Sequence, residues 1–162
     1  MRTIIVYYSM NGNTALAAKT LAERLSADLL MINPEKAYPD KGVRKFLWGG
    51  KSAVMAETPK LVPYTFKAQD YDMVILGFPV WASNIAPPIR TFVNDNRETL
   101  KDRQIAAFAC QSGNGAEKAF GKLEDILEGN KLMATMILID PKDRPSVENE
   151  RKMKEFIEKI NG

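Results

Sequence analysis

Short apolar runs alternate with stretches of helical periodicity along the chain, and this alternation constrains the fold more than any other feature. Residues 4–8 are apolar and rich in β-branched and aromatic side chains, as expected of a strand buried on both faces. After Thr14, apolar residues recur at i, i+3, i+4 and i+7, which is the spacing of one helical face. A chain that repeats this pattern is predicted to form a parallel sheet covered by helices on both sides.

The pattern predicts an α/β fold with a doubly wound, five-stranded parallel sheet. Right-handed crossovers and a final helix fit the strand order 2-1-3-4-5, a three-layer sandwich in which strands 1 and 3 are neighbours. Ligands bind at the carboxyl ends of the strands at such a switch point. The expected strands are residues 4–8, 27–32, 71–77, 104–110 and 132–139, all of them buried. The expected helices follow Thr14, open at Pro87-Pro88, run from Ala116 to Leu127, and follow an N-cap at Ser146.

Composition narrows the possible chemistry. The 162 residues fit one domain, 1–162, with no histidine and a single cysteine, Cys110. An imidazole base, a Ser-His triad and a histidine-ligated metal are therefore excluded. The net charge of +3 does not indicate a nucleic-acid partner, and no apolar run is long enough to cross a membrane. The lone cysteine, and a strand that begins right after Met1-Arg2-Thr3, favour a cytoplasmic protein.

The loop after the first strand is polar, small and uncharged: Ser9-Met10-Asn11-Gly12-Asn13-Thr14. It precedes a helix, so backbone N–H groups and the positive helix end face outward, and hydroxyl and amide side chains add neutral donors. This arrangement suits a phosphate group. The alternative is a plain cap, in which Asn13 or Thr14 caps the helix and the rest is a turn. No Gly-Lys-Ser/Thr follows, so the loop is not of the Walker type.

Two further loops are predicted to reach the same switch point. Pro79-Val80-Trp81-Ala82-Ser83 holds Trp81 stiffly, either as a core residue or as a platform for a planar ligand. Gln111-Ser112-Gly113-Asn114 is glycine-containing and also precedes a helix, so it is either a second capped turn or a backbone wall of a site. A phosphate pocket, an aromatic platform and a backbone wall together describe a site for FMN.

The three loops, in this order, resemble those of the flavodoxin family, and the resemblance covers essentially the whole chain. It rests on residues 9–14, on Gly77-Phe78-Pro79-Val80-Trp81 with the following Ala86-Pro87-Pro88, and on residues 112–115. The resemblance implies that residues of the first loop hold the phosphate of FMN. It also implies that residues 79–83 line the flavin ring, with Trp81 against or beside it, and that residues 111–114 meet its pyrimidine edge.

This sequence departs from the family pattern in three places. The third loop lacks the aromatic residue that many flavodoxins place over the flavin, so one face of the ring is either open or covered by Tyr38, Phe46 or Trp48. Ser83-Asn84 stands where many flavodoxins have Gly-Asp. Residues 34–67 form a long connection with seven lysines and arginines against three acidic residues, a local balance of +4, and residues 43–54 suggest a helix.

Two functions follow from the resemblance. One is an electron carrier, a monomer or weak dimer that works between a reductase and an acceptor protein. The alternative is an FMN-dependent NAD(P)H quinone or nitro reductase, which an open ring face and the basic segment 34–67 would favour. A regulatory module that has lost its cofactor is a third class, and the intact first loop argues against it. We interpret Cys110 as a small buried residue near the pocket.

Overall fold

A five-stranded parallel sheet in the order β2-β1-β3-β4-β5 forms the centre of the computed structural model, which describes residues 1–39 and 56–162. The predicted fold class and strand order are confirmed. The helix suggested for residues 43–54, with Phe46 and Trp48, lies outside the described residues. The elements are β1 (Thr3–Tyr7), α1 (Asn13–Leu25), β2 (Asp28–Met31), the 3-10 turn η1 (Ala68–Asp70), β3 (Met73–Pro79), α3 (Pro87–Leu100), β4 (Gln104–Gln111), α4 (Ala116–Ile126), β5 (Leu132–Ile139) and α5 (Val147–Asn161).

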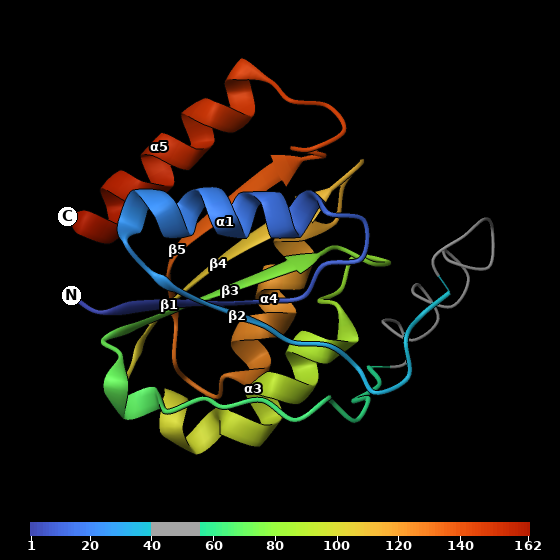
Figure 1. The fold of residues 1–162 in the computed structure, drawn as a ribbon, viewed down its shortest axis with the longest axis vertical. Helices are drawn as coiled ribbons and strands as arrows, with labels where there is room; N and C mark the ends of the chain where they lie inside the picture. Colours follow the sequence, from blue (N-terminus) through green and yellow to red (C-terminus); the bar gives the residue numbers. More distant parts are fainter. Residues whose placement is uncertain (40–55) are drawn as a thin grey trace.

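Helices cover both faces of the sheet, as Figure 1 shows: α1 and α5 lie on one face, and α3 and α4 on the other. Successive strand side chains point to opposite faces, so β3 contributes Leu76 and Phe78 to the core beneath α3 and α4. Ile75 faces α1 and α5, together with Phe108 of β4. Each face thus has its own apolar core, and the two cores hold the carboxyl ends of β1, β3 and β4 in one row.

The expectation that every strand is buried is wrong for β2, and it holds only in part for β5, the other edge strand, where Met133 is 42% exposed. Leu29 and Met31 are each 43% exposed, and Asp28 is exposed as well. Within the described residues β2 pairs only with β1, so it is an edge strand with a neighbour on one side. The apolar composition that predicted a buried strand does not distinguish an edge from a centre.

The loops after β1, β3 and β4 meet at the carboxyl edge of the sheet (Figure 1), because parallel strands end on the same side. The register pairs Tyr7 with Gly77 and Pro79 with Cys110, so the three strands end within a few residues of one another. This edge is the switch point that the strand order predicts. Among the described helices, none has the length and apolarity that a membrane crossing requires.

Close packing of β3 against β4 depends on Gly77, and replacing it tests the fold. A Cβ at Gly77 would lie 2.3 Å from Cζ of Phe108, its partner in the register. We expect Gly77→Ala to lower the free energy of unfolding by about 1–3 kcal/mol, because the Phe108 ring must move within a packed core. Urea denaturation measures the change.

Gly121→Ala is the matched control, since Gly121 lies in α4 and a Cβ there meets nothing within 4 Å. Alanine favours a helix over glycine, so we expect this variant to be more stable by up to about 1 kcal/mol. A second variant that combines Gly77→Ala with Phe108→Leu should recover part of the loss. Equal stability of Gly77→Ala and the wild type would contradict the packing argument.

Candidate functional site

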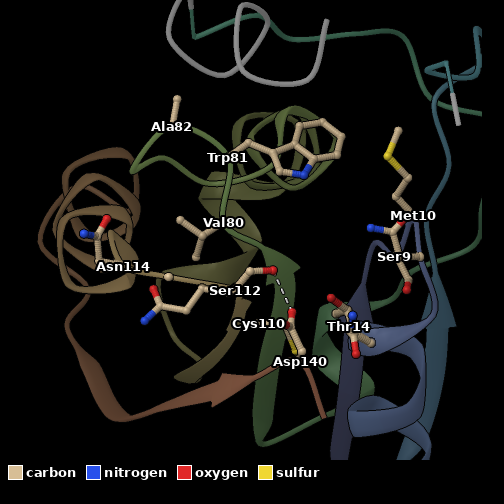
Figure 2. Close-up of a pocket in the computed structure, with 14 residues that line it drawn as sticks. Ser9, Met10, Thr14, Val80, Trp81, Ala82, Cys110, Ser112, Asn114 and Asp140 are labelled. Atoms are coloured by element: carbon tan, nitrogen blue, oxygen red, sulfur yellow. Dashed lines mark hydrogen bonds between the residues drawn. The ribbon is translucent and has the colours of Figure 1, made fainter. Parts of the chain in front are cut away.

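A cavity of about 260 Å³ opens at the carboxyl ends of β1, β3 and β4 (Figure 2). The structure places twelve of the fifteen predicted site residues in its lining, and Gly12, Pro79 and Ser83 lie outside it. Cys110 and Asp140 line it in addition. The predicted residues in the lining are Ser9, Met10, Asn11, Asn13, Thr14, Val80, Trp81, Ala82, Gln111, Ser112, Gly113 and Asn114.

The first loop leaves backbone donors of α1 unused. Gly12 is the N-cap, in the left-handed region at φ 93°, so neither Asn13 nor Thr14 caps the helix. The hydroxyl of Ser9 accepts a hydrogen bond from the Ala15 N–H at 3.1 Å. The N–H groups of Asn13 and Thr14 have no acceptor in the part of the chain that the structure describes. A helix N-terminus with free N–H groups beside a cavity is suited to an anion.

Asn13 lines the cavity, but its amide serves a different purpose from the one predicted. Its Nδ2 donates to the Asp143 carboxylate at 3.0 Å, and its Oδ1 accepts from the Lys142 N–H at 2.8 Å. The side chain therefore ties the first loop to residues 140–146, which we call the β5–α5 loop. The backbone N–H of Asn13 has no such partner among the described residues and is available to a ligand.

The second loop is a tight turn in a strained conformation. Trp81 and Asn84 exchange two backbone hydrogen bonds of 3.1 and 3.0 Å across Ala82 and Ser83, whose φ angles are 50° and 58°. Two consecutive left-handed residues are typical of a type I′ turn, which usually contains glycine, and each such residue costs about 1–3 kcal/mol. The buried Asn84 side chain holds the turn by accepting from Ile85 N and from Arg90 Nη2, both at 2.9 Å.

This turn explains which of its residues reach the cavity. Gly115 packs so closely on Ser83 that a Cβ there would lie 2.7 Å from the Ser83 hydroxyl. Ser83 is thus held against the start of α4, outside the cavity, while Trp81 and Ala82 line it (Figure 2).

Two tyrosine rings pack against Trp81. The Trp81 ring lies edge-to-face with Tyr38, at 5.2 Å between centroids, and with Tyr8, at 5.8 Å. Tyr8 is buried, and this burial raises the pKa of its hydroxyl, so the group is neutral at physiological pH. Tyr38, one of the three aromatic residues suggested to cover a face of the flavin ring, contacts Trp81. Phe46 and Trp48, the other two candidates, lie outside the described residues.

The third loop repeats the capping device of the first. α4 begins after Gly115 at φ 105°, and Gln111 Oε1 accepts a hydrogen bond from the Ala116 N–H at 2.9 Å. The Gln111 side chain is thus used to cap α4. Ser112, Gly113 and Asn114 are exposed and face the cavity with small side chains and backbone.

Sequence reasoning missed Asp140, which follows β5. The Ser112 hydroxyl donates to its Oδ1 at 2.8 Å (Figure 2), and Arg144 Nη2 binds its Oδ2 at 2.6 Å. Arg144 also donates to the Ser112 carbonyl at 2.8 Å, so it both compensates the charge of Asp140 and fixes the third loop. Asp140 follows β5, which is not one of the two strands, β1 and β3, that meet at the switch point. In the sequence, only its position at the carboxyl end of a strand indicates that it could reach the cavity.

Cys110 lines the cavity floor but is chemically quiet. Burial raises the pKa of its thiol to about 12, and a side-chain hydrogen bond joins it to Thr14. No group of three or more histidine, cysteine, aspartate or glutamate side chains that could hold a metal occurs among the described residues. The lining thus consists of hydroxyl, amide, aromatic and backbone groups that are suited to binding.

Comparison with known proteins adds to this geometry. The model of the family described as Flavodoxin matches residues 2–160. No curated protein sequence matches the chain. A flavoprotein from Lactobacillus acidophilus, solved in complex with FMN, is 18% identical, with a TM-score of 0.73 and coverage of 88% of this chain and 95% of that one.

Two further solved structures share the fold. A candidate flavoprotein from Bacteroides eggerthii is 20% identical, with a TM-score of 0.78 and coverage of 99% and 98% of the two chains. Oxidised flavodoxin 1 from Bacillus cereus is 15% identical, with a TM-score of 0.58 and coverage of 99% and 98%.

The state of Cys110 can be tested directly by alkylation. Because its pKa is about 12 and only 4% of the residue is exposed, we expect iodoacetamide at pH 8 to modify the native protein more than about a hundredfold more slowly than the unfolded chain. Mass spectrometry follows the reaction. Ser112→Cys, on the exposed third loop, is the positive control and should react quickly in the native state. A native rate for Cys110 within tenfold of the unfolded rate would contradict the buried thiol.

Proposed function

The chain belongs to the flavodoxin family, and on that premise we propose that it binds FMN in the cavity described above and carries electrons between redox partner proteins. The observation that carries the proposal is the pair of unused N–H groups, on Asn13 and Thr14, at the end of α1 that borders the cavity. Free N–H groups at a helix N-terminus favour a phosphate without any cationic side chain.

The residues present fit each part of FMN. The Ser9 and Thr14 hydroxyls and the start of α1 provide polar groups for the phosphate, and Arg144 compensates the one carboxylate in the lining, Asp140. Val80, Trp81 and Ala82 supply an apolar and aromatic wall for the ring. The exposed backbone of Ser112, Gly113 and Asn114 faces the same space.

Bound FMN would supply the redox chemistry, which no side chain of this site can provide. The role of the chain is then to bind and orient. The strained Trp81–Asn84 turn and the Arg144–Ser112 bond fix two walls of the cavity before a ligand arrives. Preformed walls reduce the ordering cost of binding.

We propose reductase and acceptor proteins as the partners, for a monomer or weak dimer in the cytoplasm. The proposal is supported by the single cysteine and by the exposed third loop, which leaves one side of the cavity accessible to another protein. The same exposed loop favours a second candidate function, an FMN-dependent NAD(P)H quinone or nitro reductase. An open cavity would admit a second ligand, and the +4 balance of residues 34–67 would attract a nucleotide phosphate.

Titration of the apoprotein with flavins tests the cofactor. We expect it to bind FMN more tightly than FAD, since the first loop suits a terminal phosphate. Thr14 is 1% exposed and lines the cavity, so Thr14→Val should weaken FMN by roughly tenfold or more, the value of one charge-assisted hydrogen bond. Riboflavin, which has no phosphate, should lose little affinity. Quenching of flavin fluorescence measures all of these dissociation constants.

Thr20→Val is the control, because Thr20 bonds the Leu16 carbonyl within α1, away from the cavity lining. It should leave the affinity for FMN unchanged. No binding of FMN by the wild type, or recovery of FAD alone from the protein as expressed, would count against the proposed site.

Rapid mixing of the oxidised, FMN-loaded protein with NADPH and a quinone separates the two candidate functions. We expect slow bleaching of the flavin absorbance by NADPH and prompt reduction by dithionite, because the described cavity has no groups that would anchor a second nucleotide. Bleaching at about 10 per second, an ordinary enzymatic rate, would overturn the carrier and favour the reductase.

A further inference from the structure

We propose that Lys142 is a positioning residue for a phosphate monoester: its ammonium group fixes the Asn11–Gly12 peptide so that the Gly12 N–H points at the phosphate. Lys142 lies on the β5–α5 loop, which contributes Asp140 to the cavity lining, but Lys142 itself is not in the lining. The inference rests on the proposed function and deepens it, because it adds a residue that positions one of the donors for the phosphate.

Lys142 is anchored at both ends against the first loop. Its backbone N–H donates to Asn13 Oδ1 at 2.8 Å, and its Nζ donates to the Asn11 carbonyl at 3.1 Å. Between these contacts the side chain lies on Gly12: a Cβ there would be 3.1 Å from Lys142 Cδ and 3.3 Å from Nζ. Glycine therefore suits position 12 for two reasons: the backbone has a left-handed φ of 93°, and the Lys142 side chain approaches closely.

Because a peptide group is planar, the contact of Lys142 with the Asn11 carbonyl also fixes the direction of the Gly12 N–H. No peptide bond in the described chain is cis, and in a trans peptide the C=O and N–H point in opposite directions. Lys142 is exposed and not in the cavity lining, and its Nζ lies on the carbonyl side of the Asn11–Gly12 peptide. The Gly12 N–H therefore points away from Lys142, and it has no acceptor among the described residues. With the N–H groups of Asn13 and Thr14, it completes a set of three adjacent donors.

Charge favours the same role. Lys142 forms no ion pair with any carboxylate in residues 1–39 and 56–162, whereas its neighbour Arg144 is paired with Asp140. The Asp143 carboxylate accepts from the Asn13 amide. An ammonium bound to a carbonyl polarises the peptide and strengthens its N–H as a donor. The benefit goes to an anion held by the Gly12 N–H, and not to the uncharged parts of a flavin.

Paired titrations with FMN and riboflavin test the role of Lys142. We expect Lys142→Met to weaken FMN about fivefold, less than a direct charge-assisted bond because Lys142 acts through a peptide. Riboflavin should bind as it does to the wild type. Lys142→Arg should retain FMN affinity within about twofold, since a guanidinium also donates to a carbonyl. Lys159→Met, which removes an exposed lysine at the far end of α5, should change neither ligand.

Amide NMR gives a readout that does not depend on the flavin. On addition of inorganic phosphate to the apoprotein, the Gly12 amide proton of the wild type should move downfield, and that of Lys142→Met should move less. The same spectra show whether the variant is folded, and Lys142→Gln serves if the methionine variant is not.

Each other outcome overturns the inference in a recognisable way. Equal losses of FMN and riboflavin affinity in Lys142→Met would mean that the residue only supports the loop. Unchanged FMN affinity would mean that it has no role. If the wild type binds FMN and riboflavin equally well, the phosphate preference falls while flavin binding stands. If it binds neither, the proposed function falls as well.

Discussion

The parallel pairing of β1 with β3 is the constraint on which the site depends. It places the start of α1, which follows β1, beside the turn that follows β3, although more than sixty residues separate Thr14 from Trp81 in the chain. Because β1 and β3 are central and buried, their ends have little freedom to move. The sheet therefore fixes where the three loops meet, and the loops supply most of the cavity lining.

Much of this could be predicted from the sequence because it depends on local periodicity. The apolar runs located the strands, and Ser146 was correctly predicted as the N-cap of α5, where it accepts from the Asn149 N–H at 3.0 Å. The three loops could be placed at one edge because strand ends in a parallel sheet share a side. The roles of their residues in binding a cofactor stay predictions.

What could not be predicted depends on contacts between distant segments. Asn13 and Gln111 are residue types that often bind ligands. In this structure the side-chain oxygen of Asn13 accepts a hydrogen bond from the β5–α5 loop, and that of Gln111 accepts one from the start of α4. Asp140 and Lys142 reach the cavity region only because the β5–α5 loop crosses toward α1, which no pattern in residues 140–146 signals. The exposure of β2 likewise depends on what lies next to it. In each case the sequence gives the residue itself but not the distant residue that it contacts.

The capping of α1 has a thermodynamic consequence. Ser9 satisfies one N–H of the first turn, and the N–H groups of Asn13 and Thr14 are left to solvent or a ligand. A ligand that satisfies them binds the native state only, because the donors converge only when α1 and β1 are formed. At a free concentration a hundred times its dissociation constant, such a ligand adds about 2.7 kcal/mol to the stability of the fold. The apparent melting temperature of the chain thus becomes a measure of ligand supply, and its lifetime in a cell full of proteases would follow that supply.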